Sequence, residues 1–175
     1  MSGKIVGLAI LLSALIAGAA LYYLQIYGFY EDATADVAEV RLMPLGADQP
    51  VAIPVADITA IDAESSPIRF RACFTTSADL PTLAATYTGL DRAKPRNAPK
   101  WFDCFDAEAI AQDLKDGTAL AFLGEKNVRY GVDRIVAVTQ DGRGYIWHEL
   151  NDCGEKAYDG TIVGEECPPF EGAGQ

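Results

Sequence analysis

The longest hydrophobic run of the chain lies near its N-terminus. Residues 5–24 contain no charged side chain, and 17 of these 20 positions are hydrophobic. A helix rises about 1.5 Å per residue, so the run would be about 30 Å long, which matches the hydrocarbon core of a bilayer. Tyr22, Tyr23, Tyr27 and Tyr30 follow at its end, and aromatic side chains of this kind favour the headgroup region. The pattern predicts a transmembrane anchor within residues 1–30.

A cleaved signal peptide is the alternative interpretation of the same run. Residues 5–16 have the length of a signal-peptide core, and the Ala-Gly-Ala triplet at 17–19 fits a cleavage site. The run continues beyond that triplet to Leu24, which favours a retained anchor. Both interpretations export the remainder of the chain.

The charges on either side of the run predict its orientation. Lys4 precedes it, whereas Glu31 and Asp32 follow it. Because positively charged flanks stay on the cytoplasmic side, we expect a single-pass protein of the bacterial inner membrane with a cytoplasmic N-terminus. Residues 31–175 would then form one periplasmic domain.

Small residues recur along one side of the predicted anchor. Gly3, Gly7, Ala14 and Gly18 are separated by four, seven and four positions, which places them on one helix face. Small side chains let two helices approach closely inside a membrane. One hypothesis is that this stripe packs against integral membrane protein subunits; the other is that glycine and alanine are simply common in such helices.

Beyond residue 30 the pattern changes to short β-rich segments separated by turn residues. The predicted strands are residues 37–45, 51–55, 58–63, 68–75, 118–124, 128–139 and 144–150. Helices are predicted at 79–87, with Ser77 as N-cap, and at 107–115, between an Asp106 N-cap and a Gly117 C-cap. Residues 88–100 form a predicted surface loop with four cations. The sequence therefore predicts a compact α+β domain with a mainly antiparallel, twisted sheet and one or two helices.

Charge narrows the classes of partner. The chain has 14 Lys and Arg against 25 Asp and Glu, a net charge of −11, which opposes binding to nucleic acid. A solvated acidic surface is the default interpretation of this charge. The alternative is that the charge attracts a basic periplasmic protein as partner.

The four cysteines of the chain favour two disulfides, because their number is even and the domain is expected outside the cytoplasm. They contain no C-x₂₋₄-C pair, which argues against zinc. Three pairings are possible. We favour Cys73–Cys104 and Cys153–Cys167, because each joins sequence neighbours and the second would clip a tail rich in glycine and proline.

No catalytic, cofactor-binding or metal-binding residue is predicted. His148 is the only histidine, and it follows Trp147 in a predicted strand, so the two side chains would point to opposite faces. One histidine without a recognisable nucleophile motif does not indicate a catalytic triad. We expect it to be a surface or half-buried residue of a protein that is not an enzyme.

Several short motifs resemble those of a known family. They are FRACF at 70–74, WFDCF at 101–105, FLGEKN at 122–127, DGRGY at 141–145 and CGEKAYDG at 153–160. In these motifs the chain resembles an uncharacterised alphaproteobacterial family of single-span, membrane-anchored periplasmic proteins. The resemblance implies a location and supplies no mechanism.

These observations lead to one expected function and one alternative. The first is a non-enzymatic accessory subunit of an inner-membrane complex, such as a respiratory complex of the cytochrome oxidase kind. The alternative is a periplasmic assembly or binding factor that acts transiently on its partners. A hydrolase would require a polar cleft for which the sequence gives no motif.

Overall fold

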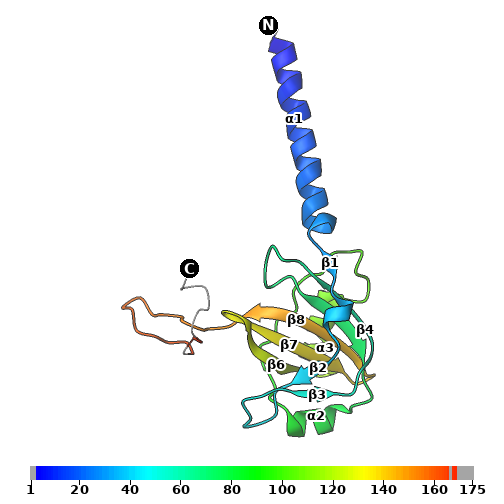
Figure 1. The fold of residues 1–175 in the computed structure, drawn as a ribbon, viewed down its shortest axis with the longest axis vertical. Coiled ribbons are helices and arrows are strands. Elements are labelled where there is room, and N and C mark those ends of the chain that lie inside the picture. The colour runs from blue at the N-terminus through cyan, green and yellow to red at the C-terminus, as the bar shows by residue number, and fades with distance from the viewer. Residues whose placement is uncertain (1–2, 166, 169–175) are drawn as a thin grey trace.

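A long N-terminal helix stands on a folded domain in the computed structural model, which describes residues 3–165 and 167–168 (Figure 1). The helix α1 (Gly3–Tyr23) continues into one π-helical turn, η1 (Leu24–Gly28). Within the described residues, this segment is the one helix long and apolar enough to cross a membrane, and the domain buries none of its hydrophobic window. The predicted N-terminal helix is therefore confirmed.

The described part of the domain contains a six-stranded antiparallel sheet and a separate two-stranded hairpin. In spatial order the sheet consists of β1 (Glu31–Asp32), β4 (Ala56–Asp62), β5 (Arg71–Thr75), β8 (Arg143–Leu150), β7 (Val132–Thr139) and β6 (Ala119–Arg129). The hairpin pairs β2 (Val40–Leu42) with β3 (Val51–Ile53), and the other elements are η2 (Thr34–Asp36), α2 (Leu80–Thr86) and α3 (Ala107–Asp116). The predicted α+β class is confirmed.

Both faces of the sheet are buried, because alternate side chains of its central strands enter two different clusters. In β8, Ile146 packs with α2 and the β2–β3 hairpin, whereas Tyr145 and Trp147 pack with α3. Strand β7 divides in the same way. The domain thus has three layers, with the central strands in the middle, and this explains why those strands are hydrophobic at nearly every position.

Two sequence predictions about local structure are wrong. Residues 128–139 do not form one strand: β6 extends to Arg129, and the chain reverses at Gly131, whose φ of 73° suits glycine. The N-cap of α2 is Asp79, which accepts a hydrogen bond from Thr82 N at 3.0 Å, and not Ser77. An aspartate one residue before the helix competes better for the free amides than a serine three residues before it.

The second domain helix is capped as predicted. Asp106 accepts hydrogen bonds from Glu108 N at 3.0 Å and Ala109 N at 3.1 Å, and Gly117 adopts a left-handed conformation at the C-terminal end. The strand predicted at 37–45 is shorter, because Met43 N leaves the hairpin to donate to Leu123 O of β6. This bond holds the hairpin against the sheet.

A close approach at Gly144 provides a test of the packing. An added Cβ would overlap the Phe74 ring, which lies over this glycine in the neighbouring strand. We expect Gly144→Ala to lower the free energy of unfolding by about 1–3 kcal/mol, the usual cost of overpacking. Gly89→Ala is the control, because its nearest atom would be Ala121 O at 3.9 Å. Equal stability of the two variants in denaturant titrations would contradict this packing.

Candidate functional site

Two disulfides join the four cysteines in the pairings favoured by the sequence. Cys73 is bonded to Cys104, with their Cα atoms 6.3 Å apart, and Cys153 is bonded to Cys167, with their Cα atoms 4.9 Å apart. The first fastens a long loop, residues 88–106, to the central strand β5. The second closes the C-terminal segment. Disulfides of this kind indicate an extracytoplasmic domain.

A buried arginine reinforces the attachment of loop 88–106. Arg71, with only 4% of its surface exposed, donates from Nε to Arg96 O at 2.8 Å and from Nη2 to Asn97 O at 3.0 Å. Its Nη1 donates to Ile68 O at 2.9 Å and Phe70 O at 2.6 Å. One guanidinium therefore binds four backbone carbonyls from two segments.

The charge of Arg71 is balanced by dipoles. Burial lowers its pKa to about 10, which still leaves the side chain protonated at neutral pH. The guanidinium also lies 5.7 Å from the centre of the Phe105 ring, within the range of a cation–π contact. The arginine is thus a structural clamp in which four of the five N–H donors bind the backbone.

His148 differs from the sequence expectation. It is buried, with 5% of its surface exposed, and it stacks on Phe70 with ring centres 4.8 Å apart. Its Nδ1 lies 2.8 Å from Pro67 O, and its Nε2 accepts from Arg134 Nε at 3.2 Å. Burial, opposed in part by the bond to Pro67, lowers the pKa to about 4. The imidazole is therefore neutral at pH 7 and both ring nitrogens have partners.

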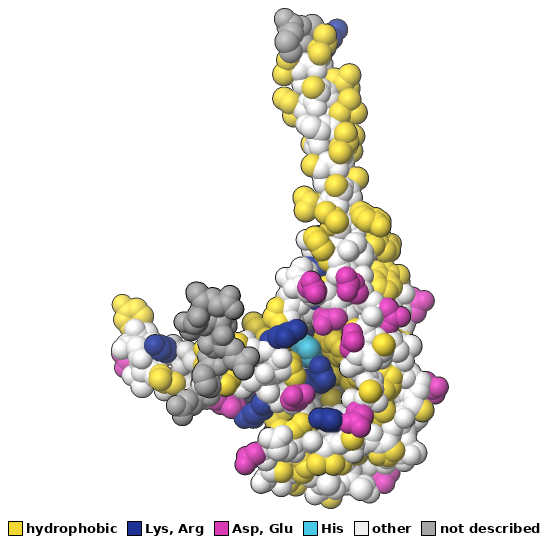
Figure 2. All heavy atoms as spheres, viewed as in Figure 1, with side chains coloured by type: hydrophobic (Ala, Val, Ile, Leu, Met, Phe, Trp, Pro, Cys, Tyr) yellow, Lys and Arg dark blue, Asp and Glu magenta, His cyan; other side chains and the backbone are white. Residues whose placement is uncertain are grey.

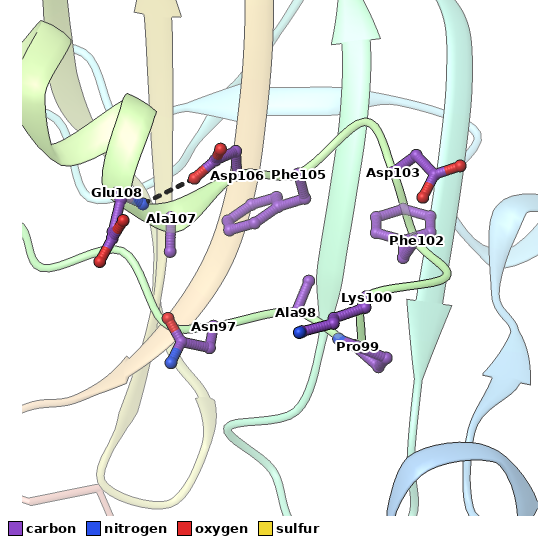
Figure 3. A pocket seen from close by; sticks show the side chains of 10 residues that line it. All are labelled: Asn97, Ala98, Pro99, Lys100, Phe102, Asp103, Phe105, Asp106, Ala107 and Glu108. Atoms are coloured by element: carbon purple, nitrogen blue, oxygen red, sulfur yellow. Dashed lines mark hydrogen bonds between the residues drawn. The ribbon is translucent and has the colours of Figure 1, made fainter.

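A hollow of about 520 Å³ lies between the loop and the start of α3 (Figure 3). Residues 97–100 run along one side of it and residues 102–108 along the other. Its lining includes the carboxyl groups of Asp103, Asp106 and Glu108 and one cation, Lys100. Asp106 is already committed to capping α3. This arrangement does not provide a nucleophile with an adjacent base.

Loop 88–106 also contacts the end of the N-terminal helix. Trp101 Nε1 donates to Ile26 O at 2.7 Å, and its ring lies 6.4 Å from that of Tyr27 and 5.9 Å from that of Tyr30. Arg69, from the turn before β5, adds a hydrogen bond to Gln25. The domain is therefore seated against η1 by side chains from two loops.

The C-terminal arm, described at residues 151–165 and 167–168, leaves the sheet after β8 and extends sideways from the domain (Figure 1). A bridge between Lys156 and Ile162 makes it a narrow loop, which the second disulfide closes. Lys126 forms an ion pair with Glu165 at 2.6 Å at its base. Tyr158 is fully exposed, and Ile162 and Val163 each expose more than half of their surface.

The four small residues predicted to pack against a partner helix are all exposed on α1. Nothing lies within 4 Å of a Cβ added at Gly3, Gly7 or Gly18, and Ala14 is also exposed. The domain does not cover the stripe, and its role in helix packing stays a prediction. Among the described residues, no group of three His, Cys, Asp or Glu side chains is placed to hold a metal ion.

Sequence reasoning missed three functional features of this arrangement. They are the clamp by Arg71, the contact of Trp101 with η1, and the exposed apolar tip of the arm. An arginine within an otherwise hydrophobic strand was a signal for the first. The contact of Trp101 had no local signal, because it joins residues 75 positions apart.

The clamp can be tested by substitution. We expect Arg71→Met to lower the free energy of unfolding by about 3 kcal/mol, because it leaves buried carbonyl groups without donors. Arg41→Met is the control, since Arg41 forms an exposed ion pair with Glu39 and such pairs contribute less than about 1 kcal/mol. Chemical denaturation monitored by tryptophan fluorescence measures both, and similar losses would contradict the clamp.

The buried histidine makes stability depend on pH. The folded pKa of His148 is about 4 against 6.5 for the free side chain, so the unfolded chain binds more protons between these values. The contribution of neutral His148 to the free energy of unfolding is complete above pH 6.5. About 3 kcal/mol of it is lost as the pH falls towards 4. We expect the free energy of unfolding of His148→Gln to depend less on pH between pH 4 and 6.5 than that of the unaltered chain. Parallel curves of this free energy against pH for the two proteins would contradict the prediction.

Comparisons with known proteins place the chain in a family. The model of a family of unknown function, DUF6446, matches residues 40–168, which is most of the chain and nearly all of the domain. Comparison with curated proteins found no match, and neither did comparison with solved structures. The match covers both disulfides, loop 88–106 and the arm. The chain therefore belongs to the DUF6446 family.

Proposed function

We propose that the protein is a non-enzymatic accessory subunit of an inner-membrane complex, such as a respiratory complex, with its domain in the periplasm. The helix would span the membrane with its N-terminus in the cytoplasm. The arm would bind a part of the complex that extends beyond the bilayer. The proposal thus requires two contact surfaces, one within the membrane and one outside it.

The C-terminal arm is the main observation that supports this proposal. Its exposed apolar residues, Tyr158, Ile162 and Val163, contribute little to the folding of the domain, because they lie outside both hydrophobic clusters. The disulfide and the backbone bond from Ala157 N to Thr161 O at 2.7 Å restrict the conformations of the loop. A binding element that is ordered beforehand loses less entropy when it binds.

The charge of the arm suggests the chemistry of its partner. Between residues 151 and 168 the sequence has five acidic residues and one lysine, a net charge of −4. An apolar tip with an acidic surround is complementary to an apolar pocket with a basic rim. This is consistent with the basic periplasmic partner that the net charge of the chain would attract.

The helix supplies the second surface. Hydrophobic side chains cover α1 along its length, clear of the domain (Figure 2). The stripe at Gly7 and Gly18 is open, so a neighbouring helix can approach its backbone closely. Substitution there leaves the domain unchanged, because the glycines contact no residue of it.

Quantitative co-purification from membranes in mild detergent tests both surfaces. We expect Gly7→Leu and Gly18→Leu to weaken association about 5- to 30-fold, which corresponds to 1–2 kcal/mol of helix packing. Ala20→Leu, on the opposite face of α1, is the matched control. Tyr158→Ser in the arm is compared with Val51→Ser, an exposed apolar residue of β3.

The outcomes separate the candidate functions. Stoichiometric recovery with a membrane complex, reduced by the stripe and arm variants and not by their controls, supports an accessory subunit. Recovery far below stoichiometry favours the transient assembly factor. A solitary protein at native expression would overturn both.

A further inference from the structure

Residues 92–101 differ in charge from the rest of the domain. They contain four cations, Arg92, Lys94, Arg96 and Lys100, and no acidic residue, in a chain of net charge −11. All four side chains are exposed. None belongs to the ion pairs found among the described residues. The segment therefore presents unpaired positive charge.

The contact with η1 fixes the height of this segment relative to the hydrophobic helix. Trp101 donates to the carbonyl of Ile26, two residues beyond Leu24, where Gln25 interrupts the hydrophobic run. At about 1.5 Å per residue, this is about 3 Å past the end of the run, which is the depth of the headgroups. Trp101 remains 39% exposed and continues the aromatic belt of Tyr27 and Tyr30.

Two of the four cations are positioned by contacts of the loop itself. Lys100 immediately precedes Trp101. Arg96 is positioned by its carbonyl, which accepts from the buried Arg71, so its side chain leaves the loop at a fixed place. Lys94 lies farther along, where its backbone N donates to Glu149 of β8.

We infer that Arg96, Lys100 and Trp101 form a docking face for the phosphate groups of anionic lipids, in the leaflet on the domain's side of the membrane. Trp101 lies among the headgroups and the two cations bind their phosphates. The face holds the domain upright on the membrane beside its anchor. This inference rests on the membrane placement in the proposed function and on no partner protein.

Lipid fits this face better than a protein or a soluble anion. A protein surface would have to enter the headgroup layer to reach Trp101, whereas lipid is already there. The anchor keeps the face beside the bilayer, so a weak interaction is sufficient because the effective lipid concentration is high. Glu31 and Asp32 repel anionic lipid, but salt limits the range of that repulsion to about 8 Å at physiological ionic strength.

Quenching of tryptophan fluorescence by brominated lipid tests the inference. The full chain is inserted into nanodiscs of brominated phosphatidylcholine, with or without phosphatidylglycerol. The only other tryptophan, Trp147, is fully buried in the domain core, so Trp101→Phe gives the unquenched baseline. We expect stronger quenching of Trp101 with phosphatidylglycerol, weakened by added sodium chloride.

The cations are tested by matched substitutions with glutamine. We expect Lys100→Gln and Arg96→Gln each to reduce the ratio of docked to undocked domain about fivefold, the effect of one basic residue at an anionic surface. Lys115→Gln, at the end of α3, is the control and should behave as the unaltered chain. Near-ultraviolet circular dichroism checks that each variant is folded.

Two results would overturn the inference. One is equal quenching with and without phosphatidylglycerol; the other is loss of the difference when inorganic phosphate replaces chloride at equal ionic strength, which would identify a site for free phosphate. Because the nanodiscs hold no partner subunit, failure here leaves the accessory-subunit proposal standing. Loss of co-purified partners with an intact lipid response would remove only that proposal.

Discussion

The attachment of loop 88–106 to strand β5 is the interaction on which the rest of the structure depends. The loop has little regular structure, yet it covers part of the second face of the sheet, where Phe105 packs on Trp147. Ordering such a segment costs conformational entropy, about 1–2 kcal/mol per residue for the backbone. The disulfide from Cys73 to Cys104 offsets part of this cost, and Arg71 satisfies carbonyl groups that burial would otherwise leave unpaired.

The same attachment connects the domain to its helix. Once the loop is fixed to the sheet, Trp101 is presented to η1 at a defined place, and the helix, loop and sheet form one continuous body. The arm then projects from a domain whose orientation relative to the helix is set (Figure 1). The accessory subunit that we propose would benefit from such a fixed relation, because its contacts inside and outside the membrane could form together without further ordering.

Local sequence signals predicted much of this fold, whereas contacts between residues far apart in the sequence could not be predicted from them. The caps of α3 at Asp106 and Gly117 are read from neighbouring residues, and the cysteine pairing was inferred from the order of the four cysteines along the chain. The burial of His148 depends on Pro67, 81 positions away, and on a guanidinium that also packs over Phe70. The strand predicted at 128–139 was wrong, since periodicity alone does not show where a chain of continuous β-formers reverses. The site depends on such contacts more than the fold does.

Nuclear magnetic resonance of the full chain in nanodiscs, with tryptophan and tyrosine selectively labelled, tests the central claim that the loop joins the domain to its helix. The two tryptophans give two indole N–H signals. We expect the Trp101 indole to show nuclear Overhauser effects to the rings of Tyr27 and Tyr30 and slow exchange with water, because it is bonded to Ile26 O. Rapid exchange of this proton without a cross-peak to either ring would contradict the account.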